Sequence, residues 1–155
     1  MSNLSIGERA HIVQAIAPQA INTGVSSDVW SMKNYAHASI IVAVGAVGTD
    51  ITLTVLECDN FTPSNSTAIA FDYYVAAAAN GDTVGTRQSA TTAGATILAT
   101  GGDNKFIVIE IEDQQLTDGY PNLRVVTSAS AGTNLLGCVA VLTGQRFGTD
   151  VTAIA

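Results

Sequence analysis

Few residues in this sequence are of a type that could carry out chemistry, and their spacing favours none of the common reaction centres. The chain has two histidines, His11 and His37, and two cysteines, Cys58 and Cys138. No Gly-x-Ser-x-Gly elbow is present, so a Ser/His/acid triad has no support. His37 stands at the start of a predicted strand, where a lone histidine is more often a hydrogen-bonded structural residue than a general base. We therefore expect no catalytic residues and predict that the chain is not an enzyme.

Carboxylates are densest at Glu110, Glu112, Asp113 and Asp118. Glu110 and Glu112 alternate along a predicted strand and so share one face, where paired carboxylates could do acid/base chemistry or bind Ca²⁺. The stretch lacks the spacing of a calcium loop, however, and is read as the solvated side of the strand. The glycine-rich segments lack a dinucleotide fingerprint and a Walker lysine. The sequence thus predicts no metal, no cofactor and no cofactor-binding residues.

The two cysteines each lie within an apolar run, and no Cys-x-x-Cys spacing is present. This context predicts buried, reduced thiols that act as small hydrophobic residues. A disulfide would require that the strands carrying Cys58 and Cys138 face each other, and neither residue supports a zinc or redox motif.

Composition excludes several further classes of protein. The chain has 155 residues, 47% hydrophobic and 12% charged, with 6 basic and 13 acidic residues and a net charge of −7. Such a length and apolar content suit one folded domain, and the shortage of Lys and Arg argues against nucleic-acid binding. No apolar run approaches the roughly 18 residues of a spanning helix. The first residues do not read as a signal peptide, so we expect the chain to stay in the compartment where it is made.

From Asp28 onward the sequence is rich in Val, Ile and Thr, with turn-forming residues at short intervals. This pattern predicts an all-β, single-domain β-sandwich or jelly-roll-like fold of about eight strands over residues 26–155. Alternation of apolar and polar residues is clearest at 51–58 and 105–112. The side chains expected to face the core are Ile51, Leu53, Val55, Ile107, Ile109, Ile111, Val139 and Val141.

Residues 1–25 precede the clear β pattern and are predicted to form an N-terminal arm. The arm could be one or two helical turns or an extended segment. The arm's apolar side chains must be buried, either in its own sheet as an extra edge strand or against a neighbouring molecule. We favour the neighbour because Pro18 and Gly24 interrupt the segment too often for a good internal strand. The candidate partner-interface residues are therefore Ile6, Ile12, Val13, Ile16 and Ile21.

Several segments together resemble small structural proteins of tailed bacteriophages. Two of them are a strand introduced by Asp103-Asn-Lys105 and a strand beginning Tyr120-x-x-hydrophobic-Arg-Val. The segments that carry the resemblance are Trp30–Tyr35, Ala38–Gly45, Thr49–Leu56, Ala70–Tyr74, Asp103–Glu110, Tyr120–Val126 and Val139–Phe147. Within that class the chain resembles head decoration (cement) proteins.

The resemblance implies a β-sandwich or jelly roll that is made in the host cytoplasm and binds the major capsid protein on the exterior of the virion. It implies stabilisation of the capsid, no catalytic residues and a homo-oligomer, with a trimer favoured because closed cyclic symmetry matches a three-fold lattice position. The alternative is another virion module, such as a tail or fibre-base adhesin that binds a host receptor. An adhesin would more often expose aromatic loops, whereas this chain is only 6% aromatic.

Overall fold

The computed structural model describes residues 5–76, 83–128 and 131–146, and strands dominate these residues. The predicted all-β sandwich is confirmed, with eleven strands in the described ranges rather than about eight. The additional strands include segments of two to four residues, which are too short to show a readable alternation. The elements are α1 (Ile6–Arg9), β1 (His11–Ala20), β2 (Trp30–Ser31), β3 (Tyr35–Val47), β4 (Ile51–Cys58), β5 (Ser66–Ile69), β6 (Phe71–Ala76), β7 (Gln88–Ala90), β8 (Ala95–Ile97), β9 (Lys105–Glu112), the 3₁₀ turn Asp113–Gln115, β10 (Asn122–Thr127) and β11 (Asn134–Gln145).

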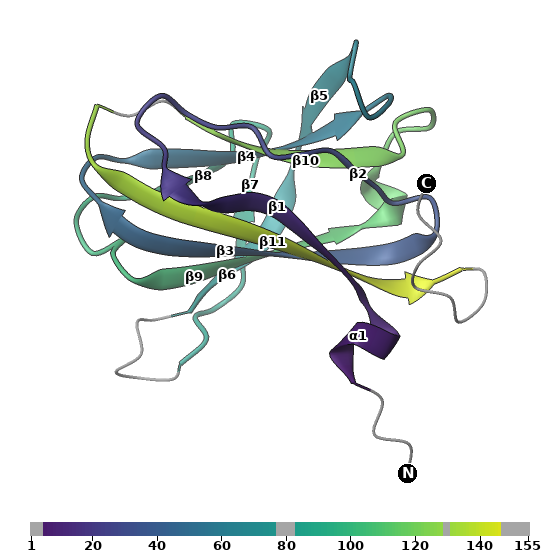
Figure 1. Ribbon diagram of the computed structural model, residues 1–155, viewed down its shortest axis with the longest axis horizontal. Helices are drawn as coiled ribbons and strands as arrows, with labels where there is room; N and C mark the ends of the chain where they lie inside the picture. Colours follow the sequence, from purple (N-terminus) through teal and green to yellow (C-terminus); the bar gives the residue numbers. More distant parts are fainter. Residues whose placement is uncertain (1–4, 77–82, 129–130, 147–155) are drawn as a thin grey trace.

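Two antiparallel sheets stack face to face (Figure 1). The six-stranded sheet has the order β1-β11-β3-β9-β6-β7, and the five-stranded sheet has the order β2-β10-β4-β5, with β8 also paired to β4. The long strands β11, β3 and β9 form the centre of the larger sheet. The short strand β8 is the part of the smaller sheet that pairs with the start of β4.

The core lies between the sheets and is built from alternate residues of each strand. Ile51, Leu53 and Val55 of β4 have no exposed surface and face the larger sheet. Ile109 and Ile111 of β9 are equally buried, as are partners from β3 and β10. The burial of these side chains confirms the inward orientation predicted for β4 and β9. Threonines in β4, and Glu110 and Glu112 in β9, alternate with them and mark the solvent side.

The predicted inward orientation of Val139 and Val141 is wrong. Both side chains are only half-buried, whereas Cys138, Ala140 and Leu142 of the same strand are buried against the core. Residues 135–142 are apolar in both phases of the alternation, so periodicity could not choose between the two faces. The pairing of β11 with β3 decides which residues of β11 face outward, since it places Val139 opposite the half-buried Ile41.

The predicted separation of an arm, residues 1–25, from the sandwich is also wrong for strand β1, while residues 1–4 lie outside the described residues. Strand β1 pairs antiparallel with β11 and forms one edge of the larger sheet. The segment is thus an extra edge strand, the alternative that we did not favour from the sequence. Two register shifts interrupt this pairing, one at Ala15 and one before Gln19. Pro18 lies in the second irregular stretch of an edge strand, where the missing amide hydrogen is tolerated. The bulges explain why the apolar spacing of β1 imitates that of a helix.

We predict that Ile109→Ala lowers the free energy of unfolding by about 2–5 kcal/mol, because it removes buried methyl groups and leaves a cavity. Its neighbour Val108 points to the opposite face of β9 and is half-buried, so Val108→Ala should cost less than about 1 kcal/mol. Urea unfolding followed by circular dichroism measures both values. Equal losses for the two variants would contradict the assignment of faces.

Candidate functional site

The outer face of the six-stranded sheet is apolar along its centre. Ile41 of β3 pairs with Val139 of β11 on one side and with Val108 of β9 on the other, so the three side chains form a row across the sheet. The rows on either side continue it, since Ile12 pairs with Val141 and Ala43 pairs with Phe106. We call this surface the apolar face, and its outward side chains are Ile12, Ile41, Ala43, Phe106, Val108, Val139 and Val141.

Much of the apolar face is accessible to solvent. Phe106 is 52% exposed and Ile12 is 47% exposed, while the row between them is half-buried. An antiparallel sheet with one solvated face normally alternates apolar residues inside with polar residues outside. A contiguous apolar surface that breaks this rule is a candidate site of interaction with another molecule.

The helical turn α1 lies at one margin of the apolar face. Ile6 and Ala10 line a groove together with Val141 and Thr143 of β11. In Figure 1 this turn extends beyond the end of β1, away from the sandwich. Ile6 is 62% exposed, so it extends the apolar surface beyond the edge of the sheet.

A polar cluster forms another margin of the same face. We call it the His37 cluster, and it consists of His37 and Ser39 of β3 with Glu110 and Glu112 of β9. The Nε2 atom of His37 lies 2.7 Å from Oε2 of Glu110, and its Nδ1 atom lies 3.0 Å from Oε1 of Glu112. Ser39 donates a hydrogen bond of 2.7 Å to the same oxygen of Glu110. The prediction that His37 is a hydrogen-bonded residue of a strand is thus confirmed.

His37 links the two central strands at this margin. Each of its ring nitrogens faces a carboxylate oxygen of β9, so the side chain bridges β3 and β9. Since the cluster is only partly buried, its main consequence is to order the side chains at this margin.

The next strand adds an ion pair to the polar margin. Asp72 of β6 lies opposite Glu110, and Arg87 and Ser89 donate hydrogen bonds to its carboxylate. The hydrogen bond from Arg87, followed by that from Ser89, holds the pKa of Asp72 below its usual value. The margin thus carries three carboxylates, one guanidinium and one histidine along a single edge of the apolar face.

The His37 cluster contains the order of groups found in a catalytic triad, but not its hydrogen bonds. Ser39 Oγ lies 3.2 Å from Nε2 of His37, whose Nδ1 contacts Glu112. However, the hydroxyl of Ser39 donates its hydrogen bond to Glu110, whereas the serine of a triad donates to the imidazole. The amides of β3 pair with β11 and β9 on both sides, which leaves them unable to serve as an oxyanion hole. The absence of an enzymatic activity stays a prediction.

The predicted interface residues divide into two groups. Ile16 and Ile21 are 3% and 0% exposed and belong to the core of the sandwich, and Val13 packs against that core. Ile16 and Ile21 are therefore not available to a partner, and the half-buried Val13 directs its side chain to the core. Ile6 and Ile12 are exposed, and Ile12 lies on the apolar face itself. The availability of these two side chains keeps them as candidate interface residues.

Sequence reasoning missed the rest of the apolar face. Val139 and Val141 are predicted to face the core, and Ile41 lies in a near-continuous apolar run in which no alternation marks an outward side. The available signal was the excess of apolar residues in both phases of residues 38–47 and 135–142. Such an excess predicts a strand whose two faces are both covered, and the described residues of this chain cover only one of them.

No group of three or more His, Cys, Asp or Glu side chains in the described part of the chain is arranged to hold a metal ion. No helix in the same residues is long and apolar enough to cross a bilayer. The expectations of no metal and no cofactor stay predictions.

No protein-family model and no curated protein matches this chain. Among solved structures, the SPBc2 prophage-derived protein YomS is similar with a TM-score of 0.43 and 8% identity, over 93% of this chain and 100% of that chain. An infectious bursal disease virus Gt strain structure is similar with a TM-score of 0.24 and 11% identity, over 89% of this chain and 42% of that one. The VP2 subviral particle of the same virus gives a TM-score of 0.26 and 11% identity, over 86% and 40%.

Both cysteines are buried and unpaired, as predicted, with Cys58 in the smaller sheet and Cys138 in the larger one. Burial raises the pKa of both thiols, that of Cys138 to about 12. Because a raised pKa keeps the thiol protonated, we predict that raising the pH from about 7 to 9 leaves Cys138 slow to react with a thiol reagent. Peptide mass spectrometry after labelling measures this. Unfolding in guanidinium is the control, and fast labelling of Cys138 in the native state would contradict the prediction.

Proposed function

We propose that this chain is a head decoration (cement) protein of a tailed bacteriophage, and that it binds the outer surface of the major capsid protein lattice through the apolar face. The observation that carries the proposal is the contiguous apolar surface on the larger sheet. The sequence resemblance to phage structural proteins supplies the class of partner. The His37 cluster, whose hydrogen bonds do not activate Ser39, is consistent with a binding role for this face.

The apolar face has enough side chains for stable binding. Complete burial of one large apolar side chain contributes about 1.5–3 kcal/mol, and the face carries several of them. Association costs roughly 4–15 kcal/mol in lost translational and rotational freedom, so partial burial of the whole face is needed for a net gain. A homo-oligomer, for which we favour a trimer, would bind several capsid subunits at once and add avidity.

The polar margin would set the orientation of the contact. Asp72, Glu110 and Glu112 outnumber the single guanidinium of Arg87 at this edge. Complementary basic groups on the capsid surface would favour one register of docking over others. The net charge of −7 suits a position outside the shell, away from the packaged DNA.

The test is to titrate the protein onto heads assembled without it. We predict that Phe106→Asp binds at least about tenfold more weakly, equivalent to about 1.4 kcal/mol, because it places a charge within the apolar face. Phe106 is 52% exposed, so the substitution should leave the fold and its circular dichroism unchanged. The matched control is Phe61→Asp, since Phe61 is 53% exposed in the loop between β4 and β5.

Unchanged binding of the Phe106 variant would contradict the use of the apolar face, and a loss confined to the Phe61 variant would place the contact on that loop. Imaging of intact particles tests the location independently. Density for the chain over the capsid lattice supports decoration. Density at the tail or at a fibre base would instead support a receptor-binding adhesin.

A further inference from the structure

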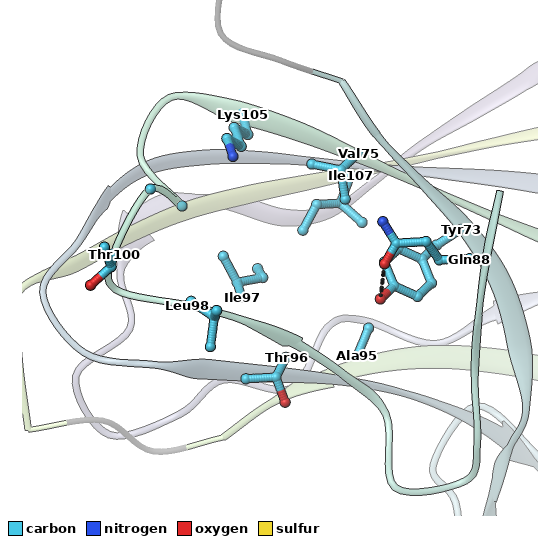
Figure 2. A pocket seen from close by; sticks show the side chains of 12 residues that line it. Tyr73, Val75, Gln88, Ala95, Thr96, Ile97, Leu98, Thr100, Lys105 and Ile107 are labelled. Atoms are coloured by element: carbon cyan, nitrogen blue, oxygen red, sulfur yellow. Dashed lines mark hydrogen bonds between the residues drawn. The ribbon is translucent and has the colours of Figure 1, made fainter. Parts of the chain in front are cut away.

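A separate hollow lies between the two sheets, at the end of the sandwich where β8 faces β6 and β9. Figure 2 shows apolar side chains from both layers around it, with Val75 and Ile107 on one side and Ala95 and Ile97 on the other. Its volume is about 160 Å³. It shares no lining residue with the apolar face, so the two sites can be tested separately.

The hollow lies where inward-facing residues of β6 and β9 meet the short strand β8 of the smaller sheet. Val75 of β6 pairs with Ile107 of β9, and both belong to rows that face the interior. Strand β8, the part of the smaller sheet that lines the hollow, has three residues and includes the small side chain of Ala95. At the adjoining turn, a Cβ atom added at Gly102 would lie 2.3 Å from the carbonyl oxygen of Leu98. The backbone of Gly102 therefore packs closely against the backbone of Leu98 at this wall of the hollow.

Polar side chains also line the hollow, namely those of Tyr73, Gln88, Thr96, Thr100 and Lys105. At one end, Tyr73 donates a hydrogen bond of 2.8 Å to Oε1 of Gln88 (Figure 2). At another, Lys105 begins β9 and occupies the same inward-facing row as Ile107, Ile109 and Ile111. A lysine in such a row lays its alkyl stem on the apolar wall and keeps its ammonium at the opening.

The ammonium of Lys105 forms no ion pair with a carboxylate among the described residues. Asp103, two residues earlier, instead accepts a hydrogen bond from the backbone amide of Val47. An apolar hollow with a cation at its opening is complementary to a molecule that has an apolar body and one terminal negative charge.

We propose that this hollow, the Lys105 pocket, binds a small apolar monocarboxylate. The hydrocarbon part would lie against Val75, Ile97 and Ile107, and the carboxylate would accept a hydrogen bond from the ammonium of Lys105. An apolar protein cavity of about 150 Å³ holds one benzene molecule. A chain of about six carbon atoms, such as hexanoate, therefore matches the available volume.

The experiment is a titration of the isotope-labelled full chain with hexanoate and, separately, with the neutral analogue 1-hexanol, followed by methyl NMR. We expect shifts confined to the methyl groups of Val75, Ile97 and Ile107. Hexanoate should bind at least about threefold more tightly than hexanol, because only the acid gains the attraction of the ammonium. In Lys105→Met, which keeps the stem and removes the charge, that preference should disappear.

Lys33→Met is the matched control, since Lys33 is exposed and does not line this pocket, and it should keep the preference for the acid. A second variant, Ala95→Val, adds bulk to the pocket wall and should weaken both ligands while the circular dichroism stays native. Equal affinities for acid and alcohol in the unsubstituted protein would overturn the proposal. So would methyl shifts that lie elsewhere on the sandwich, or a preference that survives in Lys105→Met.

Discussion

The pairing of β3 with a long strand on each side is the constraint on which the rest of the structure depends. Register with β11 and with β9 sends Ile40 and Val42 into the core and Ile41 to the outside. It therefore creates at once the tightly packed interior and the apolar row across the outer face. The same register brings His37 beside Glu110 and Glu112, so the polar margin has its origin in this pairing too.

An apolar outer face has a cost for an isolated molecule, because water contacts side chains that could be buried. Phe106 and Ile12 remain about half exposed in the described structure. Neither belongs to the core of the sandwich, which is formed by other residues of both sheets. A partner that covers the face would turn this cost into binding free energy, and this is the physical basis for the proposed role on a capsid surface.

The sequence predicted the fold class and the orientation of the strands in which polar residues mark one side. In β9, Glu110 and Glu112 alternate with isoleucines, and in β4 threonines alternate with Ile51 and Leu53. The orientation of Val139 was not predictable, because both phases of β11 are apolar. The place of β1 was missed because its bulges disguise a strand. The contact of His37 with Glu110 spans 73 positions and depends on sheet register, which no local pattern specifies.

The central claim is that the apolar face lies against the capsid. A photoreactive benzoylphenylalanine placed at Phe106 tests this claim most directly, on particles decorated with the full chain and irradiated. The account predicts a covalent cross-link to the major capsid protein from position 106. It predicts none from the equally exposed position of Phe61, in the loop between β4 and β5. Cross-links to the capsid from position 61 and none from position 106 would contradict it.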